Sequence, residues 1–247
     1  MIRLAERGLS EGAARLRRDE DRLFRTWETR ARKRTGVRLV WDGAMASFAD
    51  RPPRARLLFV LKEPNGPGDG SRLDLRDAPG WYGDADYRRY TWTTMARWAS
   101  CLIDGEPLED GVDAKEWIRQ IARIAVVNLK KTPGASRTRD GEVRRFLDDP
   151  YNSGMLRRQL GLYRPHVTLC GGDSVGTHVA RLYGRSDADW RQAKLGDQDD
   201  DISFTGIPEL GTVISFWHPA QRRRNPAELC RMLIEARREI VGRAAGR

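Results

Sequence analysis

The sequence predicts an α/β fold: a three-layer domain with a central, mainly parallel four-stranded sheet and helices on both faces. Short apolar runs with the branching of buried strands alternate with segments of helical periodicity, which is the pattern of a parallel sheet covered on both faces. Each run also stops abruptly at polar residues or glycines, where ligands and catalytic groups collect in such sheets. The four predicted strands are 57–61, 124–129, 167–170 and 211–217.

The N-terminal segment 10–34 has a helical pattern, because Ala13, Leu16, Leu23 and Trp27 form an apolar stripe among charged residues. The chain has 247 residues, enough for one sizeable core. We therefore expect a single domain over 1–247, in which 1–35 form an N-terminal helical extension packed on the rest.

The remaining segments follow from periodicity and from breaks at proline and glycine. A short strand and a turn are expected within 36–53, and an irregular, aromatic-rich loop within 77–90. The acidic stretch 196–201 is typical of a solvated loop, with a metal site as the less favoured interpretation. Helices are predicted over 91–104, 113–123, 150–162 and 226–241, with another opened by the glycines after Cys170.

Composition points to an anionic partner. The chain carries 45 Lys+Arg against 35 Asp+Glu, a net charge of +10, and the excess is mostly arginine, which suits bidentate phosphate contacts. Coding bias is the alternative explanation. The three cysteines are widely separated and favour neither a disulfide framework nor a metal site. No signal peptide or membrane span is recognisable, so we expect a cytoplasmic protein, and the cysteine spacing gives no reason to expect a metal. The arginine excess favours nucleic acid as the partner.

Polar clusters follow all four predicted strands, and the ends of these strands are expected to converge on one cleft. Glycines of the sequence CGGDSVG do not have the spacing of a dinucleotide-binding fingerprint, and no Walker A sequence is present. The clusters are Glu63 with Asn65, Asn128 with Lys130, Gly171 to Asp173, and His218 with the arginines after it.

Four of these motifs, KEPNGPGDG, VVNLKKTP, VTLCGG and WHPAQRRRNP, together resemble the motifs of the uracil-DNA glycosylase superfamily, in the same order. The resemblance covers about residues 56–228. It implies a uracil-DNA-glycosylase-like fold and a monofunctional DNA glycosylase, which we expect to be a monomer that binds DNA and needs no cofactor. Such an enzyme flips a pyrimidine nucleotide and hydrolyses its N-glycosidic bond, leaving an abasic site.

Two catalytic residues are implied by the resemblance. Glu63 stands where the family has the Asp or Asn before proline, which orients or deprotonates a water and stabilises positive charge on the sugar. His218 matches the histidine of the His-Pro-Ser loop, which hydrogen-bonds a pyrimidine oxygen as the base departs. Some branches of the family carry the acid one residue earlier, at the position of Lys62, but a lysine cannot serve as that acid. A carboxylate that only caps the turn is the alternative role for Glu63.

Base and DNA contacts are implied in the same way. Asn128 matches the asparagine that reads the polar edge of the base, and Trp81 or Tyr82 is the stacking aromatic. The family's loop that enters the minor groove corresponds to Arg222, Arg223 and Arg224, which suit phosphate anchoring. Lys130 and Lys131 are further phosphate contacts, together with Arg137 and Arg139.

Two departures leave the substrate open. Asn65 stands where the most uracil-specific branch has a tyrosine that blocks 5-methyl groups, and Ala220 replaces the serine of His-Pro-Ser. Uracil is the default base. A C5-modified pyrimidine, including a modified base of phage DNA, is the competitor, and the role would then be repair or anti-phage defence. The other function classes are a non-catalytic DNA- or nucleotide-binding module and a hydrolase of free nucleotides.

Overall fold

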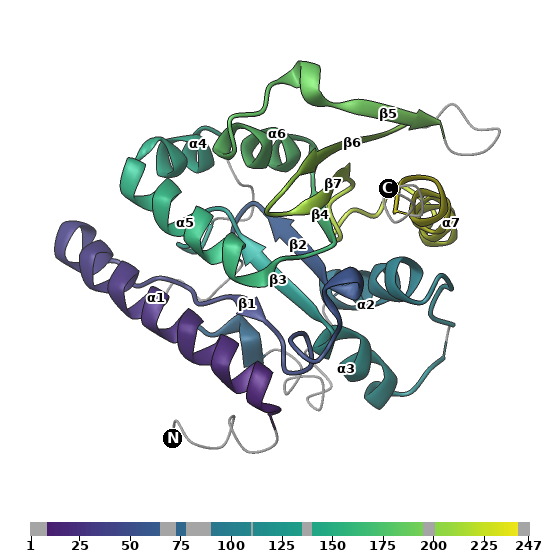
Figure 1. The fold of residues 1–247 in the computed structure, drawn as a ribbon, viewed down its shortest axis with the longest axis horizontal. Helices are drawn as coiled ribbons and strands as arrows, with labels where there is room; N and C mark the ends of the chain where they lie inside the picture. The colour runs from purple at the N-terminus through teal and green to yellow at the C-terminus, as the bar shows by residue number, and fades with distance from the viewer. Residues whose placement is uncertain are drawn as a thin grey trace.

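A seven-stranded mixed sheet lies between two layers of helices in the computed structural model (Figure 1). The model describes residues 9–64, 73–77, 90–109, 111–134, 140–194 and 201–241. This architecture confirms the predicted α/β class and the helices on both faces.

Four parallel strands form the middle of the sheet, in the order β3-β2-β4-β7, and they are the four predicted strands. Every residue of β2, β3 and β4 is buried, which explains why these strands appear in the sequence as continuous apolar runs. Because they run parallel, their carboxyl ends lie at the same edge. Their bounds are β2 Leu57–Leu61, β3 Ile124–Asn128, β4 Val167–Gly171 and β7 Gly211–Phe216.

The prediction of a four-stranded sheet is wrong, because three antiparallel strands extend it to seven. β1 (Gly43–Ala44) pairs with β3 at one edge. At the other edge β6 (Asp201–Ile207) pairs with β7, and β5 (Arg191–Lys194) pairs with β6. β1 lies within 36–53, where a short strand was expected, but it has only two residues. β5 is polar and mostly exposed, so it has neither the apolar run nor the alternation by which a strand is recognised.

Each face of the sheet has its own core. One contains Phe59, Leu61, Trp98 and Phe216, and the other contains Leu58, Val60, Trp27 and Val175. Successive strand residues point to opposite faces, so β2 contributes to both. The first face is covered by α2 (Tyr90–Ile103), α3 (Ala114–Ala122) and α7 (Pro226–Ala236), and the second by α1 (Glu11–Thr35), α4 (Asp140–Asp148), α5 (Pro150–Tyr163) and α6 (Asp173–Leu182).

α1 begins and ends where its sequence dictates. The hydroxyl of Ser10 accepts the backbone N–H of Ala13 at the start, and Gly36, with φ 70°, ends the helix in the left-handed region. Phe24 and Trp27 are fully buried, so the predicted N-terminal helix contributes to the core of its face. Within the described residues, no helix combines the length and the apolar character that a membrane span requires.

Candidate active site at the carboxyl ends of the parallel strands

The segments that follow β2 and β3 stay side by side beyond the sheet. Backbone N–H groups of Leu129 and Lys130 donate to the carbonyls of Leu61 (2.8 Å) and Lys62 (2.9 Å), and further on Gly134 donates to Pro64 (3.2 Å). These hydrogen bonds hold the KEP segment against the NLKKTPG segment. Two of the sequence motifs are therefore neighbours in space.

The segments that follow β4 and β7 meet in the same way. The backbone N–H of Gly172 donates to the carbonyl of Phe216 (2.8 Å). Gly171 has no room for a side chain, since a Cβ there would lie 2.7 Å from Leu61 Cδ2 and 3.0 Å from Pro219 Cδ. This glycine therefore lets the loop with His218 pack close to the end of β2, and the four motifs share one edge of the sheet.

The side chain of Glu63 is almost completely enclosed, with 3% of it exposed. Its Oε2 lies 2.7 Å from the Nζ of Lys130, whereas its Oε1 is buried and has no hydrogen-bond partner among the described residues. The carboxylate lies directly against the backbone of Gly134, where a Cβ would come within 1.7 Å of Oε1. One oxygen is thus fixed by an ion pair, and the other is left to accept a hydrogen bond.

Lys130 joins two acids. Besides Glu63 it binds the carboxylate of Glu142 on α4, at 3.0 Å. Burial alone would lower the pKa of Lys130, but the hydrogen bonds to Glu63 and Glu142 outweigh it and raise that pKa above its ordinary value. The ammonium therefore stays charged. Lys130, which the sequence predicted to contact DNA, thus has two acidic partners within the protein.

His218 is held as a neutral donor. Its Nδ1 accepts the backbone N–H of Ala220 at 3.1 Å, so in the neutral ring the proton resides on Nε2. Burial, and secondarily the positive charge of Lys62, lower the pKa of His218. A backbone amide orients this histidine, so the hydroxyl that Ala220 lacks is not needed to hold the ring.

Lys62, the alternative register for the acid, lies beside a second charged pair. Its Nζ is 3.7 Å from Asp140 Oδ1, and the same carboxylate oxygen is 3.3 Å from Nε2 of His178 on α6. His178 is buried. These contacts attach the start of α4 and one side of α6 to the end of β2.

Asn128 and Lys131 are buried, and both contact Asp42. Asn128 is 1% exposed, and its backbone N–H and Nδ2 both donate to Asp42 Oδ2, at 2.8 and 3.1 Å. Lys131 is fully buried, with Nζ 2.6 Å from Asp42 Oδ1. The prediction that Lys131 contacts DNA is therefore corrected, because an ammonium enclosed in the core cannot reach a phosphate. The amide of Asn128 is engaged with Asp42 rather than turned to an open cleft.

The acid that holds these two residues belongs to a buried polar network that the sequence analysis missed. Asp42 also accepts from Gln159 (2.8 Å), which in turn donates to the hydroxyl of Tyr163 (3.1 Å). Tyr163 donates to Glu20 (2.8 Å), and Glu20 pairs with Arg76 at 3.1 Å. The available signal was Glu20 itself, a charged residue on the apolar stripe of α1, four residues after Leu16.

The three arginines of the run, 222–224, differ in their exposure and in their contacts. Arg222 is exposed and lies over the ring of Tyr90, 5.1 Å from its centroid. Arg224 lies over Trp217 (5.3 Å) and pairs with Glu228 (3.0 Å), while Arg223 is exposed. Three predicted base contacts, Asn65, Trp81 and Tyr82, and the lesser candidates Arg137 and Arg139, lie outside the described residues.

Within the described part of the chain, no group of three or more His, Cys, Asp or Glu side chains could hold a metal ion. Comparison with protein-family models and with curated proteins gives no match.

Proposed function

We propose that this protein is a DNA glycosylase that hydrolyses the N-glycosidic bond of a flipped pyrimidine nucleotide. The observation that carries the proposal is the asymmetric carboxylate of Glu63, with Oε2 on Lys130 and the buried Oε1 without a partner among the described residues. A fixed carboxylate with one available oxygen suits the orientation of a water molecule and the stabilisation of a cationic sugar.

Hydrolysis would proceed with the two predicted catalytic groups in complementary roles. The bond between the sugar C1′ and the base nitrogen breaks first, and positive charge builds on the sugar beside the Glu63 carboxylate. The Nε2–H of His218 donates to a carbonyl oxygen of the base, where negative charge accumulates. Water oriented by Glu63 adds its oxygen to C1′, and its proton leaves to the carboxylate or to the departing base.

A neutral His218 fits this role, because the ring is partly buried and keeps one N–H to donate. Its lowered pKa, caused first by burial, leaves the ring uncharged at neutral pH, with Nδ1 bonded to Ala220 and Nε2 free to donate. The ring is therefore oriented before any base arrives, as electrostatic stabilisation requires.

Uracil is the default base, and a C5-modified pyrimidine is the competitor because of Asn65 in place of a tyrosine. Membership of the uracil-DNA glycosylase superfamily is part of the same proposal. It is supported by the order of the motifs and by the common strand edge from which Glu63 and His218 project.

The experiment is a strand-cleavage assay after alkali treatment, at enzyme excess. Single- and double-stranded DNA would carry uracil, 5-hydroxymethyluracil or the modified cytosines of phage DNA. We expect abasic sites from at least one of these bases and from no unmodified cytosine. If none yields abasic sites while the parent protein and its Glu63→Gln variant bind DNA equally, the protein is a binding module instead.

A further inference from the structure

Two adjoining hollows run along α2 on the face of the sheet that α3 and α7 also cover. The smaller, about 170 Å³, lies between α2 and the start of α7, and its lining includes Tyr90, Gln221 and Leu229. The larger, about 340 Å³, lies between α2 and the start of α3. Thr93 and Arg97 line both hollows, so the two form one groove, which we call the α2 groove.

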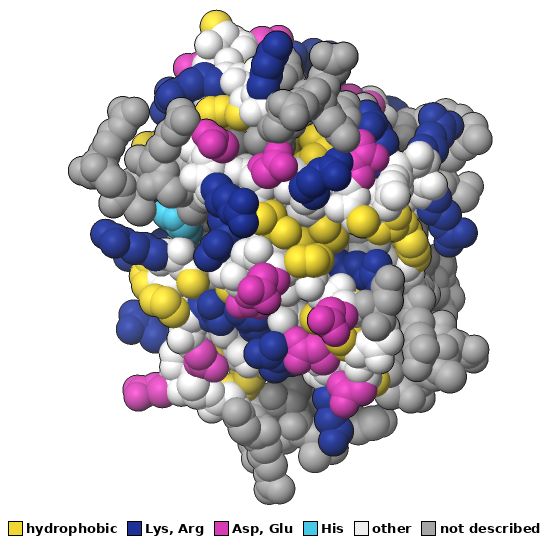
Figure 2. Space-filling view, turned by 90° about the vertical axis from the view of Figure 1, so that its right-hand side faces the viewer, with side chains coloured by type: hydrophobic (Ala, Val, Ile, Leu, Met, Phe, Trp, Pro, Cys, Tyr) yellow, Lys and Arg dark blue, Asp and Glu magenta, His cyan; other side chains and the backbone are white. Residues whose placement is uncertain are grey.

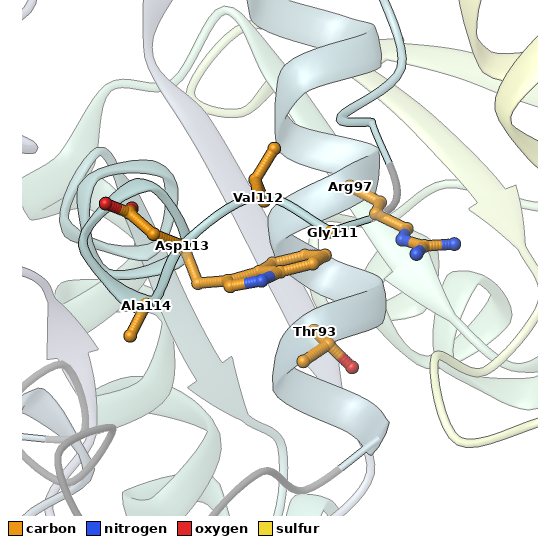
Figure 3. Close-up of a pocket in the computed structure, with 7 residues that line it drawn as sticks. Thr93, Arg97, Gly111, Val112, Asp113 and Ala114 are labelled. Carbon is orange, nitrogen blue, oxygen red and sulfur yellow. The ribbon is translucent and has the colours of Figure 1, made fainter.

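The lining of the groove is mixed, because apolar side chains such as Trp98 and Leu229 lie beside Thr93 and Arg97, which belong to both hollows. Figure 3 shows Thr93 and Arg97 on one face of α2, with the segment from Gly111 to Ala114 passing beside them. Asp113 is the only acid among the described residues that line the groove. Its carboxylate is turned away from Arg97 and accepts the backbone N–H of Glu116 at 2.9 Å, which caps α3.

Two of the aromatic rings that line the groove have an arginine guanidinium over them. Arg222 is 5.1 Å from the ring centroid of Tyr90, and Arg97 is 5.6 Å from that of Trp117. Both rings are partly exposed. Figure 2 shows the side of the molecule where α2, α3 and α7 lie, with a band of apolar side chains among arginines and lysines and with acidic residues interspersed. Flat rings beside guanidinium groups are the surface on which nucleic acid bases stack.

The groove is continuous with the loop of the candidate active site. Gln221, three residues after His218, lines the smaller hollow, and its Oε1 accepts the backbone N–H groups of Arg223 and Arg224 at 2.9 and 3.0 Å. The side chain that shapes the arginine loop is therefore also a wall of the groove. A strand that has one nucleotide at His218 can continue from there onto α2.

We propose that the α2 groove binds the stretch of a DNA strand that flanks the target nucleotide on one side. Bases stack on Tyr90 and Trp117, and a phosphate contacts Arg97. A nucleic acid strand fits better than an apolar peptide, because Arg97 lines both hollows, Arg222 lies over Tyr90 at one end, and the chain has a net charge of +10. This proposal rests on the proposed function, which supplies the DNA.

The test measures binding of the full chain to oligothymidines of about 4, 8 and 16 nucleotides by fluorescence anisotropy at several salt concentrations. For the parent we expect affinity to rise with length. Tyr90→Leu and Arg97→Gln should each lose about tenfold in affinity for the longest strand. Arg97→Gln should also make the dependence of log affinity on log salt concentration less steep, by about 0.7, which is the value for one phosphate contact to a single strand.

Arg30 and Tyr151 provide matched controls, since Arg30 lies 4.0 Å over the Tyr151 ring on α1 and α5, on the opposite face of the sheet. Arg30→Gln and Tyr151→Leu should bind like the parent, and circular dichroism would check that all variants fold. The proposal is overturned if the groove variants bind like the parent, or if the controls weaken binding equally. Thymidine binding requires no base excision, so a protein that excises nothing but binds through the groove refutes only the proposed function.

Discussion

The two carboxylate oxygens of Glu63 have different surroundings, and this difference determines what the residue can do. Oε2 faces the ammonium of Lys130, and Oε1 lies buried against Gly134. An acid that merely capped a turn would accept backbone N–H groups, and none is found for Oε1 among the described residues. These surroundings favour the proposed catalytic role of Glu63 over that of a turn cap.

Removal of Lys130 should disorder this carboxylate. In Lys130→Met, Glu63 loses the partner of Oε2, and we expect the single-turnover rate of base excision to fall about 100-fold, the usual effect of a small displacement of a reacting group. Lys130→Arg should restore part of the rate because it keeps the charge. Equal rates in Lys130→Met and the parent would show that Glu63 needs no positioning by this lysine.

A side chain at Gly134 should displace the carboxylate of Glu63, because a Cβ would come within 1.7 Å of Oε1. We expect Gly134→Ala to reduce excision at least as much as the loss of Lys130, with little change in the thermal midpoint. Gly154→Ala is the control, since a Cβ at this position on α5 has no neighbour within 4 Å. Full activity in Gly134→Ala would contradict the placement of Glu63.

His218 should make the folded state sensitive to acid. Its pKa is lowered in the folded protein by burial and by Lys62, so the unfolded chain binds the proton more readily. The stability that the neutral ring contributes is present above the ordinary histidine pKa of about 6.5 and declines as the pH falls below it. Thermal unfolding at about pH 7.5 and about pH 5.5 should therefore show a larger acid loss for the parent than for His218→Gln. Identical losses would mean that His218 is not held neutral.

The sequence was informative about single residues only where the residue type itself identifies the chemistry. Glu63 and His218 could be selected because each stands at a strand end within a recognisable motif. The different burial of Lys130 and Lys131 could not be predicted. Lys130 binds Glu63, whereas Lys131 binds Asp42, and both acids are distant in the sequence. Adjacent lysines differ in burial here because their partners come from different parts of the chain.

At the scale of elements, α1 connects β1, α5 and the segment 73–77 through one buried acid. Glu20 on this helix accepts from the backbone of Ala44, from Tyr163 and from Arg76, so it joins β1, α5 and the segment 73–77. Burial raises the pKa of Glu20, and its partners oppose that shift. The helix is thus part of the framework that holds β1 and the residues beyond the Glu63 loop.

Loss of this acid should cost stability. In Glu20→Gln the buried guanidinium of Arg76 loses one charged partner while keeping Asp74 and Asp21, so we expect a loss of about 2 kcal/mol in the free energy of unfolding. Glu28→Gln, on the same helix but outside the network, should change it by less than about 0.5 kcal/mol. Urea denaturation would measure both. Equal effects would show that the network contributes nothing.

Most elements could be predicted from the sequence, and the exceptions have physical reasons. The four parallel strands and the helices α1, α2, α3, α5, α6 and α7 match the predictions closely, because periodicity and caps specify them locally. α4 was missed: it is short, and Gly141 is its second residue, so its pattern is weak. Yet α4 supplies Glu142 and Asp140, which contact Lys130 and Lys62.

At the scale of the whole molecule, the sheet topology brings distant segments together. Glu63, Lys130 and His218 project from the ends of three strands that are neighbours only through the order β3-β2-β4-β7. The antiparallel strands at either side widen the sheet, and the carboxyl ends of the four parallel strands stay together. The sequence could predict that strand ends converge, but the strand order and the extra edge strands depend on pairing between distant segments, which no local pattern specifies.

The measurement that tests the central claim most directly compares DNA binding and base release in the parent and in Glu63→Gln. The amount of free base released under single-turnover conditions would be determined by mass spectrometry, with the affinity for the same DNA measured in parallel. We predict that Glu63→Gln binds DNA like the parent but releases base at least about 100-fold more slowly. Equal rates of release in the two proteins, or no release by the parent from any of the candidate bases, would contradict the proposed role of Glu63.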